Sequence, residues 1–143
     1  MQVSKIDASI YIGTNRCCEY HFDEKLLKKG IDYDVSLEAE KLDMPSGVEG
    51  FLWLPVKDMR APLQSQPHVG VRMIEECVKQ GKKVFVHCKN GHGRAPTLVA
   101  AYYIATKEIT VNTALELVKK KRPSAHPNNM QMKALKEFTK SLG

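Results

Sequence analysis

The fold is decided by the segment Val84-Phe85-Val86-His87-Cys88-Lys89-Asn90-Gly91-His92-Gly93-Arg94-Ala95-Pro96. Its first three residues form a short apolar run, which predicts a central β-strand. From Ala95 to Thr106 the chain is apolar nearly all round, which predicts a buried helix. The residues between them therefore form a loop at the carboxyl end of a strand, where α/β proteins bind their ligands.

This loop has the composition of an anion-binding site. Gly91 and Gly93 permit backbone angles closed to other residues, so consecutive N–H groups can turn toward one ion. The N-terminus of the following helix adds positive potential. In this setting Cys88 is favoured as a thiolate, and Arg94 can grip a phosphate with two parallel hydrogen bonds. We therefore predict a nucleophile inside a phosphate-binding loop. The residues expected to bind the phosphate are Lys89, Asn90, Gly91, His92, Gly93 and Arg94.

Strands and helices alternate along the rest of the chain. The sequence predicts strands over 3–6, 10–12, 31–37, 51–54 and 84–86, and helices over 21–29, 69–80, 95–106, 110–121 and from 128 onward. Asn128 and Gln131 have the spacing of a capping box. This alternation predicts an α/β fold with a mostly parallel central sheet flanked by helices. The length of 143 residues predicts a single domain over residues 1–143.

For two of the predicted strands, residues 31–37 and 51–54, the sequence also predicts a position in the sheet. Asp32 and Asp34 alternate with apolar neighbours, which indicates a strand end or an edge strand. Residues 51–54 are apolar, which predicts a buried strand that ends at Pro55. The segments 38–50 and 57–67 are rich in glycine, proline and charge, and are predicted to be mostly loop.

The composition excludes several classes of protein. The chain is 43% hydrophobic and 27% charged, as a globular protein should be. The apolar runs are too short to span a bilayer and no basic-then-apolar leader follows Met1, so we expect a cytoplasmic protein. The net charge of +6 is concentrated in residues 72–143 and is densest at Lys119-Lys120-Lys121-Arg122. We interpret that run as a solvated helix end; the alternative is contact with nucleic acid or a membrane, for which interleaved aromatic residues are missing.

The cysteines are predicted to be reduced thiols, because nothing in the sequence points to an oxidising compartment. Cys77 falls on the apolar stripe of its helix and is expected in the core. Cys17, Cys18 and His21 follow no usual zinc spacing and lack a fourth ligand, so we predict no metal site there. Whether Cys17, Cys18 or Cys77 can form a disulfide with Cys88 depends on distances that the sequence does not contain.

The segment from His87 to Arg94 matches the H-C-x-x-G-x-x-R signature of the cysteine-dependent protein tyrosine phosphatase superfamily. The chain resembles the small atypical dual-specificity phosphatases over nearly its whole length. Tyr11-Ile12-Gly13 resembles their entry strand, and Leu54-Pro55-Val56-Lys57-Asp58 resembles their general-acid loop. Arg122-Pro123 and Pro127-Asn128 resemble the junction before their final helix.

This resemblance implies a phosphatase that acts in two steps. Cys88 would attack phosphorus and form a phosphocysteine, while Arg94 binds the phosphoryl oxygens. Asp58 would protonate the leaving oxygen and then activate water. His87 would support the loop backbone. The implied partner is a protein carrying phosphotyrosine, with phosphoserine and phosphothreonine as further candidates, and no cofactor or metal is implied.

One position departs from the family pattern. Ala95 stands where most members carry Ser or Thr, whose hydroxyl helps the thiolate to leave; Thr97 is the next hydroxyl and a candidate supporting residue. Slower breakdown of the phosphoenzyme is the resulting hypothesis. Other functions stay open: an RNA 5′-phosphatase, favoured by the basic C-terminal half; a phosphoglucan or phosphoinositide phosphatase, suggested by Arg94-Ala95-Pro96 and by Lys89; and a pseudophosphatase that binds without turnover. The sequence does not determine the oligomeric state.

Overall fold

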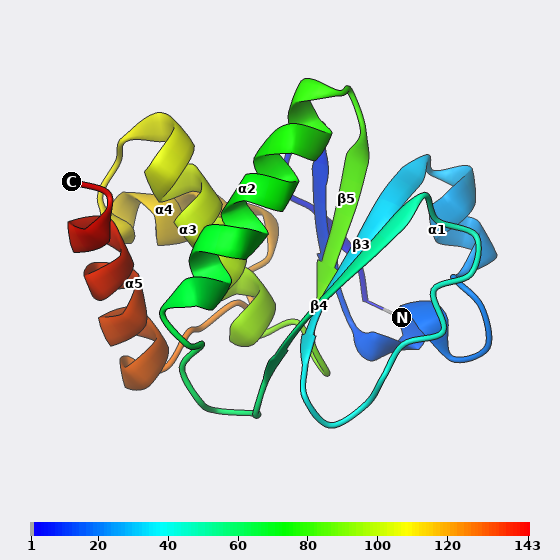
Figure 1. Ribbon diagram of the computed structural model, residues 1–143, viewed down its shortest axis with the longest axis horizontal. Helices are drawn as coiled ribbons and strands as arrows, with labels where there is room; N and C mark the ends of the chain where they lie inside the picture. The colour runs from blue at the N-terminus through cyan, green and yellow to red at the C-terminus, as the bar shows by residue number, and fades with distance from the viewer. Residues whose placement is uncertain (1) are drawn as a thin grey trace.

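A single mixed sheet forms the centre of the computed structural model, which describes residues 2–143 (Figure 1). Met1, the first residue of the predicted domain, lies outside the described residues. The strand order is β1-β2-β5-β3-β4, with β2, β5, β3 and β4 parallel and β1 antiparallel to β2. This order confirms the predicted α/β fold with a mostly parallel sheet. The strands are β1 Ser4–Lys5, β2 Ile10–Gly13, β3 Ile31–Glu38, β4 Gly50–Val56 and β5 Lys83–His87.

Helices cover both faces of the sheet (Figure 1). One face is covered by α2 Ser65–Lys79, α3 Arg94–Lys107, α4 Val111–Lys121 and α5 Asn129–Ser141, and the larger hydrophobic core lies there. The other face carries the short 3₁₀ helix η1 Asn15–Cys18 and α1 Glu24–Lys28 over a smaller core. Every residue of α3 from Arg94 to Ile104 is buried, which confirms the predicted buried helix.

Local sequence explains where the helices begin. Asn128 accepts a hydrogen bond from the Gln131 N–H while the Gln131 side chain accepts from the Asn128 N–H, so the predicted capping box is present. Thr110 caps α4 by accepting a hydrogen bond from the Thr113 N–H, without the reciprocal bond of a capping box. The helix predicted over 21–29 is shorter, because Asp23 caps it and starts it at Glu24.

The predicted environments of two strands are wrong. β3 lies inside the sheet, between β5 and β4. Its residue Asp34 is fully buried, because His87 of the neighbouring strand β5 pairs with the carboxylate. β4 does not end at Pro55 but continues to Val56, and of its residues only Leu54 and Val56 are buried. β4 is an edge strand, where a proline that donates no hydrogen bond is tolerated. Among the described residues, none of the helices has both the length and the hydropathy required to cross a membrane.

Candidate active site

The loop between β5 and α3 adopts a shape that requires glycine at one position. Gly91 has a φ of +72°, a region that residues with a side chain rarely occupy. A Cβ atom at this position would lie 2.5 Å from Nη2 of Arg122 and 2.7 Å from the carbonyl oxygen of Gly13. Gly91 therefore allows the loop to lie directly against β2 and the Arg122 side chain.

The carbonyl groups of residues 89–93 all accept hydrogen bonds from donors that surround the loop. The donors are Asn15 N–H for Lys89, the Arg122 guanidinium for Asn90 and Gly91, His126 N–H for His92, and the N–H and hydroxyl of Thr97 for Gly93. Within residues 2–143, no protein group accepts a hydrogen bond from the N–H groups of residues 89–93. The loop is thus left with free donors, which is the arrangement that an anion requires.

The charge pattern misplaces Arg122, because this residue belongs to a basic run whose sequence indicates a solvated helix end. Its side chain is 1% exposed. Nε donates to the Gly91 carbonyl at 2.8 Å and Nη2 to the Asn90 carbonyl at 3.0 Å, while Nη1 donates to Ser4 Oγ at 2.9 Å. Burial lowers the pKa of Arg122, and the nearby Cys88 opposes that change. Arg122 is therefore a structural support behind the loop.

Arg94 is anchored on one side of its guanidinium. Nη1 donates to Glu40 Oε1 at 2.7 Å and to the Val56 carbonyl at 2.6 Å, and the residue is 4% exposed. Nη2 lies 3.5 Å from Asp58 Oδ1. The anchored Nη1 fixes the plane of the guanidinium and leaves its other nitrogens for a phosphate. Nothing in the sequence pattern singles out Glu40 for this role.

The loop after β4 carries Asp58 to the same place. The Asp58 N–H donates to Glu40 Oε2 at 3.1 Å, so one carboxylate contacts both Arg94 and the Asp58 backbone. On the far side of the loop, Asn128 Nδ2 donates to the Met59 carbonyl and Gln131 Nε2 donates to the Arg60 carbonyl. The two residues of the capping box therefore also position the Asp58 loop.

Cys88 and Asp58 line one cavity of about 140 Å³. Cys88 is 3% exposed, whereas the Asp58 side chain is 58% exposed. The rings of His92 and His126 lie 5.4 Å apart at this cavity, and burial together with the charge of His126 lowers the pKa of His92. The other lining residues are Met59, Asn90, Gly93, Arg94, Asn128 and Gln131.

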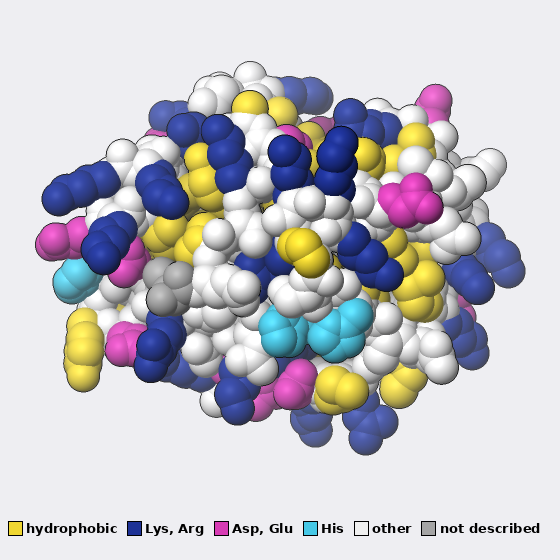
Figure 2. Space-filling view, turned by 180° about the vertical axis from the view of Figure 1, so that it is seen from behind, with side chains coloured by type: hydrophobic (Ala, Val, Ile, Leu, Met, Phe, Trp, Pro, Cys, Tyr) yellow, Lys and Arg dark blue, Asp and Glu magenta, His cyan; other side chains and the backbone are white. Residues whose placement is uncertain are grey.

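The remaining predicted site residues lie around this cavity. Lys89 is exposed and its side chain does not line the cavity. Thr97 is buried and its hydroxyl donates to the Gly93 carbonyl at 2.7 Å, so it acts on the loop backbone. Ala95 is fully buried. Figure 2 shows Lys and Arg side chains spread over one face with acidic residues between them, together with a pair of neighbouring histidines, and no continuous basic patch on that face.

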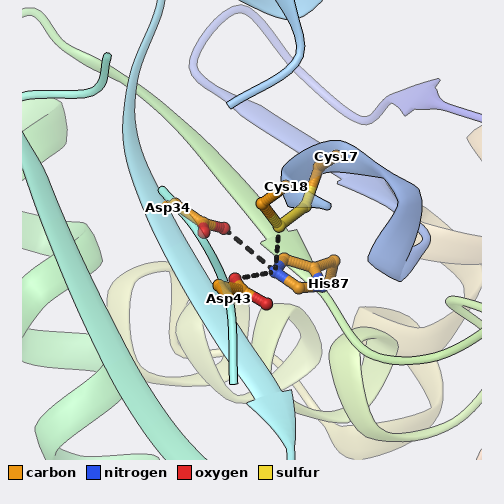
Figure 3. A group of neighbouring side chains, drawn as sticks. All are labelled: Cys17, Cys18, Asp34, Asp43 and His87. Carbon is orange, nitrogen blue, oxygen red and sulfur yellow. Dashed lines mark hydrogen bonds and ion pairs between the residues drawn. A yellow bond between two sulfur atoms is a disulfide. The ribbon is translucent and has the colours of Figure 1, made fainter. Parts of the chain in front are cut away.

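His87 lies beneath the loop in a buried polar cluster (Figure 3). Its Nε2 atom is 2.7 Å from Asp43 Oδ2 and 3.1 Å from Asp34 Oδ1. Burial by itself lowers the pKa of His87, but the two carboxylates outweigh it and raise this pKa to about 10. His87 therefore carries a proton that faces Asp34 and Asp43.

The expectation of reduced cysteines is wrong at one pair. Cys17 and Cys18 of η1 form a disulfide between adjacent residues, because the turn of η1 directs both sulfurs into the smaller core. Cys77 and Cys88 are free thiols, and Cys77 is buried as predicted. His21 does not join the cysteines, since its Nδ1 atom contacts the Phe22 carbonyl.

The chain matches the model of the dual specificity phosphatase catalytic domain over residues 10–141. The chain belongs to this family. Human dual specificity protein phosphatase 22 is 30% identical over 96% of this chain and 74% of its own length. The crystal structure of Tk-PTP in the active form has a TM-score of 0.81 at 30% identity and covers 96% of each chain. Human DUSP28 has a TM-score of 0.87 at 23% identity, covering 98% of this chain and 94% of its own, and shows the same fold.

Membership of the dual specificity phosphatase family makes this chain a cysteine-dependent phosphatase of the protein-tyrosine and dual-specificity type. The structure brings Cys88 and Arg94, from the loop between β5 and α3, together with Asp58, from the loop after β4. It also adds Glu40, which accepts a hydrogen bond from Arg94, Arg122, which donates to the carbonyls of the phosphate loop, and Gln131, which donates to the Arg60 carbonyl of the Asp58 loop.

Proposed function

We propose that this phosphatase hydrolyses phosphotyrosine in proteins through a phosphocysteine formed on Cys88. One observation carries the proposal. In the loop that begins at Cys88, every carbonyl of residues 89–93 accepts a hydrogen bond from outside the loop, whereas the N–H groups of these residues have no protein acceptor within the described chain. Donors left unpaired beside a nucleophile suit a phosphoryl group, which spreads negative charge over three oxygens in the transition state.

In the first step the Cys88 thiolate attacks phosphorus, and the bond from phosphorus to the tyrosine oxygen breaks. Asp58, in its protonated form, gives its proton to that leaving oxygen. Arg94 and the loop N–H groups hold the three remaining oxygens. Proton transfer by a positioned acid is worth about 10²–10⁴-fold in rate.

In the second step water attacks phosphorus and the bond to Cys88 sulfur breaks. Asp58, now a carboxylate, accepts a proton from the water, and inorganic phosphate leaves. The thiolate departs without help from a hydroxyl at position 95, because Ala95 carries none and Thr97 donates to the Gly93 carbonyl. This step is therefore the slow one in our proposal.

Turnover of phosphotyrosine and phosphoserine peptides in EDTA tests this function. We expect activity toward phosphotyrosine, none in Cys88→Ser, and a loss of about 10²–10⁴-fold in kcat for Asp58→Asn. Glu116→Gln, an exposed acid on α4, is the matched control and should leave kcat unchanged. Full activity in Cys88→Ser would rule out the mechanism. Faster hydrolysis of a 5′-triphosphate RNA or a phosphoinositide than of any phosphopeptide would move the substrate to that class.

Rapid mixing with p-nitrophenyl phosphate tests the slow second step. We expect a burst of nitrophenol close to the enzyme concentration, followed by a slower steady rate. Ala95→Ser should raise the steady rate and shrink the burst, because it supplies the missing hydroxyl beside the leaving sulfur. A linear progress curve in the unsubstituted protein would contradict slow phosphoenzyme breakdown, and Thr97→Ser serves as a control that retains its hydroxyl.

A further inference from the structure

Five side chains that can bind a metal ion meet beneath the phosphate loop (Figure 3). Each offers one donor atom, and these atoms all lie within 4.8 Å of one another. They come from three parts of the chain that pack together: η1, β3 with the segment after it, and the last residue of β5. All five residues are buried, and they are Cys17, Cys18, Asp34, Asp43 and His87.

Three of the four carboxylate oxygens of this cluster lack a hydrogen bond to any described residue, although both acids lie beside His87. Within residues 2–143, neither oxygen of Asp34 has a hydrogen bond, and neither does Oδ1 of Asp43. Asp34 is 0% exposed and Asp43 is 4% exposed, so water does not satisfy these oxygens from the surface. A buried carboxylate oxygen without a partner is costly and uncommon in a folded protein. His87 is the one basic side chain in the cluster, and it is shared by both acids.

The spacing of the donors suits a tetrahedral zinc ion. Zinc bonds of roughly 2.0–2.3 Å place neighbouring ligand atoms about 3.3–3.8 Å apart. Cys18 Sγ lies 3.8 Å from His87 Nε2, within this spacing, and Asp34 Oδ1 lies 3.1 Å from the same nitrogen, slightly below it. Thiolate, imidazole and carboxylate are also the ligands that zinc takes in proteins. We propose that the reduced form of this protein binds one zinc ion through Cys17, Cys18, Asp34 and His87, with Asp43 beside them as a further counter-charge.

Zinc can bind at this site only when the disulfide between Cys17 and Cys18 is reduced. Joined to each other, Cys17 and Cys18 offer no thiolate. A thiol reductant opens the bond: two reductant thiols supply two electrons and two protons, Cys17 and Cys18 become thiols, and the reductant leaves as its own disulfide. On zinc binding the two thiols and the His87 Nε2 release their protons to water. Cys17 is fully buried but borders an open surface hollow with Arg16, Glu19 and Tyr20, so this is the side from which reductant and ion would approach.

The position of the site links it to the phosphate loop. His87 directly precedes Cys88, and Asp34 lies on the neighbouring strand β3. A bound ion would therefore join η1, β3 and β5 at the end of the sheet that carries the loop. Oxidation of the cysteine pair would release the ion. The proposed site is thus a zinc site that depends on the redox state of η1, and it does not rest on the proposed substrate.

Zinc titration of the whole protein tests the proposal, with every protein in a Cys88→Ser background so that the catalytic thiol cannot act as a ligand. The protein is reduced with a phosphine, freed of metal, and titrated anaerobically in competition with a chromophoric chelator. We expect one zinc per chain when reduced and none after oxidation of the cysteine pair. Cys18→Ser and Asp34→Asn should each weaken binding by at least about 100-fold. Cys77→Ser, which removes a free buried thiol outside the cluster, should leave binding unchanged.

The absorption spectrum of the cobalt-substituted protein gives a second test. It is recorded with all the proposed ligands present, so it does not depend on whether the substituted variants fold. Reduced protein with the five side chains intact should show sulfur-to-cobalt charge-transfer bands and the visible bands of a tetrahedral site. Absence of zinc binding in the reduced protein would overturn the proposal. So would binding that survives in folded Cys18→Ser and Asp34→Asn, or a cobalt spectrum without sulfur bands.

Discussion

Glu40 joins two candidate catalytic groups with a single carboxylate. Oε1 accepts from Arg94 and Oε2 accepts from the Asp58 N–H. Burial raises the pKa of Glu40, but the hydrogen bonds from Arg94 and from the Asp58 N–H outweigh burial and hold this pKa below its ordinary value of 4.5. Glu40 is therefore ionised at neutral pH and holds Arg94 at the mouth of the phosphate loop.

Glu40→Gln is expected to cost stability in a pH-dependent way. A carboxyl whose pKa is lowered by folding adds stability that is fully present above its ordinary pKa and is lost as the pH falls through the folded value. The variant should be less stable at pH 7 by less than about 1 kcal/mol, because the side chain is 43% exposed. The difference should narrow as the pH drops below 4.5. Urea unfolding at several pH values measures it.

The kinetic effect of Glu40→Gln distinguishes positioning from a purely structural role. Because the Val56 carbonyl still holds Arg94, we expect a rise in KM and a smaller kcat, not total loss. Glu49→Gln, which removes an exposed partner of Lys82, is the control and should leave both constants unchanged. An unchanged kcat/KM in Glu40→Gln would show that Arg94 needs no carboxylate partner.

A second test at the residue scale separates backbone strain from close packing. Gly91 and Gly81 have nearly the same φ, +72° and +73°, but a Cβ at 81 would meet nothing within 4 Å. Gly81→Ala should cost about 1–2 kcal/mol in unfolding free energy with normal kcat. Gly91→Ala adds a clash with Arg122 and the Gly13 carbonyl, so it should also abolish phosphatase activity. Activity against p-nitrophenyl phosphate beside urea unfolding of both variants checks this, and equal activities would contradict it.

At the scale of elements, the residues at the N-terminus of α5 both cap this helix and hold the Asp58 loop. Asn128 caps the helix through its Oδ1 atom and holds the Met59 carbonyl through its Nδ2 atom. Gln131 completes the capping box and holds the Arg60 carbonyl. The start of a helix therefore fixes the conformation of the Asp58 loop, which is 70 residues away in the sequence.

Two helix-cap substitutions with similar expected losses of stability test whether the Asp58 loop depends on the cap of α5. Asn128→Ala and Thr110→Ala each remove a helix N-cap, at α5 and α4 respectively, and each should cost about 1 kcal/mol. Asn128→Ala should also lower kcat about tenfold, because the Asp58 loop loses an anchor, whereas Thr110→Ala should leave kcat unchanged. Thermal unfolding and steady-state kinetics of both variants decide it. Equal kcat values would mean that the loop does not depend on α5.

At the scale of the whole molecule, Arg122 ties the end of α4 to the sheet and the phosphate loop. Its guanidinium reaches Ser4 on β1, Ile12 on β2, and the carbonyls of Asn90 and Gly91. No other side chain of the described residues donates to the Asn90 and Gly91 carbonyls, so removing Arg122 leaves both without a protein partner, that of Gly91 in a buried position. Order in the loop is thus a property of the assembled fold.

Arg122→Met is expected to destabilise the protein by about 3 kcal/mol or more and to abolish activity, because the buried Gly91 carbonyl and the Asn90 carbonyl lose their charged donor. Arg122→Lys keeps the charge but reaches fewer acceptors. Its stability and activity should therefore fall between those of the unsubstituted protein and those of Arg122→Met. Lys120→Met, in the same basic run but exposed, is the control. Denaturant unfolding and kcat/KM measure both effects, and an active, stable Arg122→Met would show that the loop holds its own shape.

Much of the fold could be predicted because the signals are local. The run from Val84 to Pro96 contains a strand, a loop and a helix start in consecutive residues, and the apolar faces and caps of the other helices are equally local. Cys88 and Arg94 could be proposed for the same reason, whereas Asp58 could be proposed only because Leu54-Pro55-Val56-Lys57-Asp58 resembles the general-acid loop of the family. The alternation in β3 and the apolar run in β4 gave the wrong environments, because burial of a strand depends on its neighbours in the sheet.

The sequence by itself determined the α/β class, the order of its elements and the loop that carries Cys88, the proposed nucleophile. Only the tertiary structure decided which distant groups support that loop: Glu40 against Arg94, Arg122 behind Gly91, and the cluster around His87. The physical reason is that a strand or a helix cap is specified by residues a few positions apart. A buried polar group is instead specified by whichever partner the folded chain brings within hydrogen-bond distance.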